Sequence, residues 1–357
     1  MLADTPLQIR AVHLHLPLTV PYRLAFGEQT RFDVILVGLR DDADRTGWGE
    51  ATILPGYTDE TVDGGWSVVS DMIEQCRTAE DVSRAAQARA KTSPFVGTAF
   101  LTALDWLDDH PVLRRKGRFP LLGTVNKKSD DLGALEREVE ALIAAGYRTL
   151  KVKIGWDVEG DLHQVETVRS ITGGRARLRI DGNQGYTRDQ AVDFLSRLAP
   201  DDIELVEQPC AAGDWGAAVK VKQAATVPVM LDESIYVLDD VARAASLGCA
   251  DFIKLKLMKL GCLDNLERGL RMIADHGMVA VLGNGVAADL GCWMEVAAGL
   301  GNVSTAGEMN GFLKTPAQLL LPRLRTEGAE VVLDGTRPDL DETTVAAYTV
   351  RVLGRWH

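Results

Sequence analysis

Three carboxylates follow short apolar segments at even intervals in the second half of this chain. Asp181 follows LRI, Glu207 follows IELV and Asp232 follows VML. Each apolar segment is typical of a short buried strand, so the carboxylates are expected at the ends of three consecutive strands. Neighbouring strands lie about 5 Å apart, which would bring the carboxylates together. Because three such groups cannot all stay ionised without a compensating charge, we predict that they bind a divalent cation.

The donor atoms of this predicted site indicate which metal it would take. An all-oxygen set suits Mg²⁺, with Mn²⁺ possible. No histidine or cysteine follows these three segments, which argues against Zn²⁺. The alternative is that some of these acids cap helices or lie in solvated loops.

Lysines flank the three acids in the sequence. In RTLKVKIGWD, Lys151 and Lys153 alternate with Leu150, Val152 and Ile154, so the two lysines share one face of a strand. Lys256 ends a later strand, on the other side of the acids. Near a metal and in a pocket of low dielectric, lysine pKa values are expected to fall, and such a lysine can act as a general base or acid. The alternative is a solvent-facing edge strand.

The spacing of the polar strand ends predicts the elements that hold them. Successive strand ends lie 24 to 28 residues apart, the length of one strand, one helix and two loops. Adding a strand at 120–126 gives eight units, which favours a closed βα barrel with its active site at the carboxyl ends of the strands. A doubly wound sheet is the competing fold. The strand ends are Lys153, Asp181, Glu207, Asp232, Lys256, Asn284 and Glu308.

The first part of the chain has a different pattern. Residues 7–53 read as strands and residues 60–110 as helices, which favours an α+β domain before the barrel. The formal net charge of −12 over 357 residues argues against nucleic acid or an anionic membrane as the main partner. The five cysteines form no C-x-x-C pair, no signal peptide or membrane helix is evident, and a cytoplasmic location is expected.

The motifs KVKIG, DGNQGY, VEQP, LDES and KLKLMKLG, in this order, resemble the enolase superfamily and its muconate-lactonizing-enzyme subgroup. The resemblance implies an α/β barrel (a modified TIM barrel) with an N-terminal α+β capping domain. Residues 1–115 would form the cap, completed by about 326–357, and residues 116–325 the barrel. It also implies a small carboxylate substrate and a homo-oligomer.

The resemblance assigns roles by motif. Lys153 and Lys256 would be opposed acid/base catalysts and Lys151 an electrostatic partner. Asp181, Glu207 and Asp232 would bind Mg²⁺, and Asn183 and Glu233 beside them would orient these ligands. The mandelate-racemase-like subgroup has a histidine after strand seven. Here that strand is VAVLGNG, and His276 precedes it.

Some positions depart from the family pattern or concern the substrate. Lys254 lies on the same face as Lys256, and Cys262 stands where a second glycine is common. GEMNGF, with Glu308, replaces the Asp-x-Asp that holds the substrate ammonium in dipeptide epimerases, so a dipeptide is not expected. Asn284 precedes a glycine-rich loop that can hold a carboxylate. Two cap loops would form a lid; the candidate residues there are Arg23, Phe26, Ile53 and Tyr57.

The expected function is therefore a Mg²⁺-dependent isomerase that removes the α-proton of a carboxylate substrate. Racemisation or epimerisation of an N-modified amino acid or imino acid is favoured, because opposed lysines serve both faces of one carbon. Cycloisomerisation and β-elimination on the same site are the alternatives. Two other classes are a non-catalytic scaffold, which needs no acid/base lysines, and a Schiff-base aldolase, which needs no aligned carboxylates.

Overall fold

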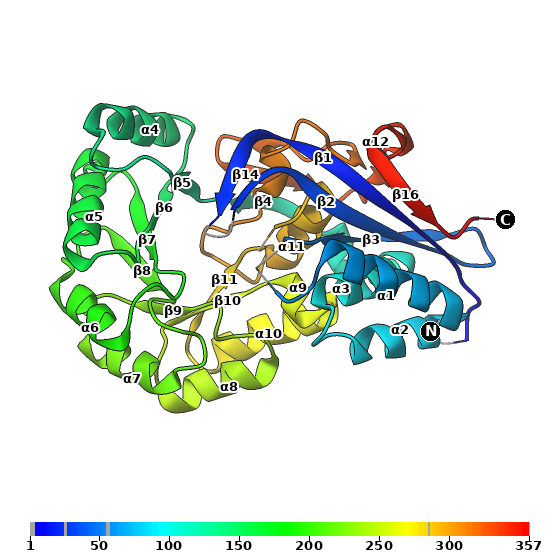
Figure 1. The fold of residues 1–357 in the computed structure, drawn as a ribbon, viewed down its shortest axis with the longest axis horizontal. Coiled ribbons are helices and arrows are strands. Elements are labelled where there is room, and N and C mark those ends of the chain that lie inside the picture. Colours follow the sequence, from blue (N-terminus) through cyan, green and yellow to red (C-terminus); the bar gives the residue numbers. More distant parts are fainter. Residues whose placement is uncertain (1–3, 25–26, 55–57, 285, 357) are drawn as a thin grey trace.

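The computed structural model describes residues 4–24, 27–54, 58–284 and 286–356, and the side chains of residues 22–28 lie outside this description. A strand-rich cap lies beside a larger part in which helices surround a parallel sheet (Figure 1). The C-terminal strand returns to the cap, where it lies against the first strand of the chain.

The cap is an antiparallel sheet with helices on one face. Along β1, Val12, Leu14 and Leu16 belong to the core shared with the barrel, whereas Ile9 and Ala11 belong to the core shared with the cap helices. This alternation is what a strand with both faces covered requires. The sheet has the order β16-β1-β2-β3, and its elements are β1 (Gln8–Leu24), β2 (Gly27–Arg40), β3 (Thr46–Thr52) and β16 (Thr349–Leu353), with helices α1 (Val62–Gln75), α2 (Ala79–Ala88) and α3 (Pro94–Leu107).

The larger part contains seven parallel strands in the order β11-β10-β9-β8-β7-β6-β5. The segment around Gly307 joins the two edges. Gly307 bridges Leu121, just before β5, and the Glu308 amide donates to the Leu282 carbonyl at the end of β11. The strands are β5 (Gly123–Val125), β6 (Thr149–Lys153), β7 (Arg177–Asp181), β8 (Ile203–Glu207), β9 (Val229–Leu231), β10 (Phe252–Leu255) and β11 (Val279–Leu282).

Helices alternate with these strands and surround the sheet (Figure 1). Several begin at side chains that accept hydrogen bonds from exposed backbone amides, such as Asp157 before α5 and Asp214 before α7. Helix α5 ends at Gly173, which has φ +54°. The helices are α4 (Leu132–Ala144), α5 (Val158–Thr172), α6 (Arg188–Arg197), α7 (Trp215–Ala224), α8 (Leu238–Leu247), α9 (Leu257–Leu260), α10 (Leu263–Asp275) and α11 (Asp289–Gly299).

Short elements complete the chain around this frame. Strand β14 pairs with both β13 and β4, and β12 pairs with β15. These elements are β4 (Lys116–Pro120), β12 (Leu320–Leu321), β13 (Thr326–Glu327), β14 (Glu330–Asp334), β15 (Asp339–Leu340) and α12 (Glu342–Tyr348), with 3₁₀ turns at Pro111–Arg114 and Gly311–Leu313.

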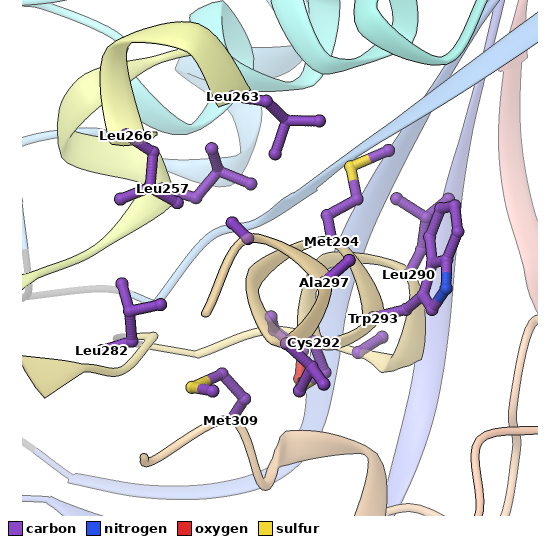
Figure 2. Close-up of a cluster of buried hydrophobic side chains, with 14 of the residues drawn as sticks. Leu257, Leu263, Leu266, Leu282, Leu290, Cys292, Trp293, Met294, Ala297 and Met309 are labelled. Carbon is purple, nitrogen blue, oxygen red and sulfur yellow. The ribbon is translucent and has the colours of Figure 1, made fainter. Parts of the chain in front are cut away.

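Helix α11 is the centre of the core that joins cap and barrel. Figure 2 shows its side chains Trp293, Met294 and Ala297 among those of neighbouring segments, including Leu263 and Met309. Ten of the eleven residues of α11 are buried, so the helix is enclosed on all sides. Its position is therefore fixed by both parts of the molecule.

The structure confirms the predicted fold class and corrects one detail. The eighth strand expected near Glu308 is only an isolated bridge at Gly307. Its chain is held by single hydrogen bonds to Pro120, Leu122 and Leu282 rather than by a continuous ladder. The domain boundaries at 115 and 325 stay predictions.

Candidate active site

Register places the predicted chemical residues at one end of the parallel sheet. Lys153 is the Cα partner of Asp181, and Asp181 is the partner of Glu207, across β6, β7 and β8. Asp232 directly follows β9, the next strand in the sheet. Asp181 and Glu207 are 0% exposed and Asp232 is 2% exposed. Three acids thus lie buried at neighbouring carboxyl ends.

None of these acids caps the helix that follows it. Helix α6 begins at Thr187, α7 at Asp214 and α8 at Val237, each several residues beyond its strand end. The helix-cap alternative therefore does not apply to Asp181, Glu207 or Asp232, and solvated loops are excluded by their burial.

Lys151 and Lys153 both point toward these acids. The Lys151 ammonium lies 2.9 Å from Asp181 Oδ2, 3.1 Å from Glu207 Oε2 and 2.7 Å from Glu308 Oε1. Lys153 Nζ lies 2.5 Å from Asp181 Oδ2 and also contacts Asn183 Oδ1. The Lys151 side chain is 7% exposed and that of Lys153 is 38% exposed. Of the two, Lys153 is thus the one that a substrate can reach.

Three further lysines approach from the other side of the acids. Lys256 Nζ lies 2.7 Å from Asp232 Oδ2, and Lys259 Nζ lies 2.9 Å from Asp232 Oδ1. Lys254 Nζ lies 2.9 Å from Glu207 Oε1, 2.7 Å from Glu308 Oε2 and 3.6 Å from Asp232 Oδ2. Lys254 is thus paired with carboxylates, and the sequence analysis missed Lys259.

Burial and the charges of neighbouring side chains shift the pKa values of Lys151 and Glu207. Burial lowers the pKa of Lys151, but the charges of Asp181, Glu207 and Glu308 outweigh it and hold that pKa well above its usual value. This shift arises from three carboxylates around one ammonium, and the expected depression of lysine pKa values near a bound metal stays a prediction. Burial and the charge of Asp181 raise the pKa of Glu207 to about 7.

The lysine ammonium groups weaken the argument that the three carboxylates need a metal ion to balance their charge. Lys151 touches both Asp181 and Glu207, and Lys254 touches Glu207 and approaches Asp232. The three carboxylates thus have compensating charges within the protein. What still fits a hard divalent cation is the donor chemistry, which is carboxylate oxygen from three consecutive strand ends.

The loops after the strands hold the acids in place. The backbone amide of Asn183 donates a hydrogen bond to Asp181 Oδ1, and the Asn183 side-chain amide donates to Glu233 Oε1 at 3.0 Å. Gln208, which sequence reasoning missed, accepts from the backbone amide of Asp232 at 3.0 Å. Gly155 and Gly185 lie so close that a Cβ on Gly185 would be 2.5 Å from the Gly155 carbonyl oxygen. The glycines of KVKIG and DGNQGY are therefore needed for the approach of these two loops.

The predicted substrate-binding residues have different positions. Glu308 joins the lysine network, and Asn284 Nδ2 lies 3.2 Å from Cys292 Sγ. Ile53 is 2% exposed and packs in the core between the cap sheet and its helices, and its role in a lid stays a prediction. The next residue, Leu54, packs in the core shared with the barrel. Phe26 and Tyr57 lie outside the described residues, as does the side chain of Arg23.

Comparison with known proteins identifies the family. A family model described as Enolase C-terminal domain-like matches residues 134–337, more than half of the chain. This chain belongs to the enolase superfamily. Within it, the chain is an isomerase, as its curated relatives named epimerase and racemase indicate.

Two curated relatives illustrate the sequence similarity. The L-Ala-D/L-Glu epimerase of Clostridium acetobutylicum is 27% identical over 288 residues, which cover 76% of this chain and 80% of the relative. An N-succinylamino acid racemase from an Amycolatopsis species is 29% identical over 323 residues, covering 85% of this chain and 86% of the relative.

Two solved structures share the fold of this superfamily member. The N-succinyl Arg/Lys racemase from Bacillus cereus superposes with a TM-score of 0.87 at 20% identity, covering 99% of this chain and all (100%) of that chain. The muconate lactonizing enzyme from Pseudomonas fluorescens superposes with a TM-score of 0.84 at 22% identity, covering 98% and 100%. Among the described residues, no helix has the length and apolar character needed to cross a bilayer.

Proposed function

We propose that this enolase-superfamily isomerase uses a divalent cation, Mg²⁺ in the first place, to racemise or epimerise an α-carbon beside a carboxylate. One observation carries the proposal. Counting the Gly307 segment as the eighth place of the ring, β6 with Lys153 and β10 with Lys256 are four places apart. Two lysines on opposite sides of a ring of eight can serve opposite faces of one carbon.

The proposed metal ligands are Asp181, Glu207 and Asp232. A bound divalent cation would supply an anchor for the substrate carboxylate and stabilise negative charge there when the α-proton leaves. Asn183 and Gln208 support the ligands, because the first holds Asp181 by its backbone amide and the second fixes the backbone of Asp232.

The lysines divide the remaining work. Lys153 or Lys256 removes the α-proton to its own Nζ, and the opposite lysine delivers a proton from its own Nζ to the other face. We do not assign Lys151 as a base, because it is buried among three carboxylates whose charges raise its pKa in the metal-free protein. It instead places a fixed positive charge 2.9 Å from Asp181 and 2.7 Å from Glu308.

The substrate that we propose is an N-acylated amino acid or an imino acid. Support comes from relatives named N-succinylamino acid racemase and N-succinyl-L-Arg/Lys racemase. A dipeptide is disfavoured, although other relatives are dipeptide epimerases, because GEMNGF lacks the Asp-x-Asp. Glu308 does not replace it, since both of its carboxylate oxygens are already paired with Lys151 and Lys254.

Cycloisomerisation or β-elimination is the second candidate. It is favoured by the unequal exposure of the two lysines, 38% for the Lys153 side chain against 4% for that of Lys256. A reaction with a single base would need only the accessible lysine, Lys153. A relative from Geobacillus stearothermophilus named o-succinylbenzoate synthase, 28% identical, fits this reading.

Proton NMR in D₂O distinguishes the two candidates. The protein is incubated with Mg²⁺ and a pool of N-acyl amino acids and imino acids, alongside Lys153→Ala, Lys256→Ala and the exposed-lysine control Lys220→Ala. We expect α-proton exchange with inversion that needs metal, with each catalytic variant blocking exchange from one enantiomer more than from the other. Equal loss from both enantiomers, or exchange without metal, would contradict the proposal. No exchange in the pool would favour the second candidate.

A further inference from the structure

A second cluster of metal-binding side chains lies in the cap, in the HLH of QIRAVHLHLPL. His13 and His15 are two residues apart on β1, so they share a face, and Asp33 on β2 is the Cα partner of His15. One ligand atom from each of the three residues lies within 4.8 Å of the other two. Among the described residues this is the one group of three such side chains that meets that limit.

The distances within the cluster match a metal site. His13 Nε2 lies 2.9 Å and His15 Nε2 lies 3.2 Å from the same oxygen, Asp33 Oδ1. Ligand atoms bound at about 2.0–2.1 Å to a tetrahedral Zn²⁺ are separated by about 3.3 Å, so an ion needs only small shifts of these side chains. The backbone of two paired strands holds the three residues, which limits the cost of assembling the site.

Access from solvent also favours a cation. Two imidazole ligands and one carboxylate would form a set with one negative charge, which the nearby Arg31 and Arg351 oppose. His13 is buried, but the side chains of His15 and Asp33 are 34% and 16% exposed, which leaves a path from solvent. Arg31 approaches Asp33 through the other oxygen, Oδ2, at 3.4 Å, so it does not compete with the two histidines for Oδ1. The centroid of the Trp66 ring lies 6.1 Å from that of the His13 ring.

We propose that His13, His15 and Asp33 form a binding site for a zinc-class divalent cation, separate from the barrel carboxylates. Two nitrogens and one oxygen suit Zn²⁺, with water completing the tetrahedron, whereas the all-oxygen set of the barrel suits Mg²⁺. The ion would tie β1 to β2 just before the irregular pairing between Pro17 and Tyr22. Its role is thus to brace this hairpin of the cap, independently of the proposed catalysis.

Calorimetric titration with Zn²⁺, in excess Mg²⁺ to saturate the barrel ligands, tests the site. We expect one Zn²⁺ per chain, visible tetrahedral bands when Co²⁺ is used instead, and a rise in Tm on Zn²⁺ addition. His15→Gln and Asp33→Asn should each weaken binding by at least about tenfold, since even residues that only support a ligand contribute about 10–100-fold. Both positions are part-exposed, and circular dichroism checks that the variants fold.

Two controls make the result decisive. His276→Gln removes an exposed histidine far along the chain, and Asp181→Asn removes a predicted barrel ligand; both should leave Zn²⁺ binding unchanged. Absence of binding, or binding that survives both His15→Gln and Asp33→Asn, would overturn the proposal. A loss of Zn²⁺ binding in Asp181→Asn alone would also overturn the proposal, because it would assign the ion to the barrel. An equal loss of Zn²⁺ binding in His276→Gln would do the same, because it would indicate binding to surface histidines.

Discussion

At the scale of single residues, Lys254 is a buried lysine among the proposed metal ligands. Its side chain is 1% exposed, and its ammonium contacts Glu207 and Glu308 from within the sheet. It thus already provides a positive charge at a place where a metal would also act. Without metal, the Lys254 ammonium stabilises the carboxylates that are the proposed metal ligands. Its positive charge also opposes the binding of a divalent cation nearby.

Replacing Lys254 by Met tests both effects. We expect the metal-free protein to lose about 3–5 kcal/mol of unfolding free energy, because removal of one partner leaves buried carboxylates uncompensated. Added Mg²⁺ should then stabilise Lys254→Met more than the unaltered protein. Urea unfolding with and without Mg²⁺ measures both quantities, with the exposed Lys220→Met as control. An equal Mg²⁺ effect in both proteins would show that Lys254 does not compete with the ion.

The sequence predicts the residues of this site better than their partners. Strand-end acids and the K-x-K pattern are visible because a polar residue after an apolar run marks the end of a buried strand. Lys259 was missed because it lies on the short helix α9, and its contact with Asp232 depends on how that turn folds back. The cluster of His13, His15 and Asp33 was also missed, since only the pairing register of β1 and β2 brings Asp33 opposite His15.

At the scale of elements, α11 carries buried acids that the site does not use. Glu295 is 2% exposed, and its Oε1 accepts from the backbone amide of Leu257, the residue after Lys256. Its Oε2 has no hydrogen-bond partner among the described residues. Burial raises the pKa of Glu295 to about 7 despite the hydrogen bond from Leu257. Glu295 therefore positions the chain that carries Lys256 while it remains easy to protonate.

Glu295 predicts a dependence of stability on pH. Its raised pKa means that the folded protein holds a proton between about 4.5 and 7 that the unfolded chain releases. The contribution of Glu295 to the unfolding free energy therefore falls as pH rises through this window. Glu295→Gln mimics the protonated acid. Its unfolding free energy relative to that of the unaltered protein should therefore be roughly 1–3 kcal/mol higher at pH 8 than at pH 5, since one pKa unit is worth about 1.4 kcal/mol. Urea midpoints at the two pH values test this, and parallel pH profiles would contradict it.

Element boundaries show why tertiary contacts limit prediction. The eight-unit spacing was readable, because strand, helix and loops have a typical summed length. The absence of a regular eighth strand could not be read from the sequence. The Gly307 segment makes only single hydrogen bonds to the chain at β4, before β5 and at the end of β11, and its composition does not reveal this.

At the scale of the whole molecule, the cap and the barrel are joined by a buried acid. Glu50 on β3 accepts from the backbone amides of Ala288 at 2.6 Å and Gly291 at 2.9 Å, at the start of α11. Thr52 donates its hydroxyl to the same carboxylate at 2.5 Å. A cap residue thus satisfies the exposed amides of a barrel helix that would otherwise be buried without acceptors. We infer that the two parts unfold together because of contacts of this kind.

Glu50→Ala tests that inference. The change leaves two backbone amides and a hydroxyl without their acceptor, and each buried unsatisfied group costs about 1–3 kcal/mol. We expect a total loss of roughly 2–4 kcal/mol, a smaller loss in Glu50→Gln, which keeps one acceptor, and little loss in Thr52→Val, which keeps the carboxylate. Tryptophan fluorescence and far-ultraviolet circular dichroism should give one coincident urea transition in the unaltered protein. In Glu50→Ala the two probes should separate, because the start of α11 no longer holds the cap. An unchanged midpoint, or a lower midpoint at which both probes still coincide, would show that the apolar core around α11 couples the two parts without Glu50.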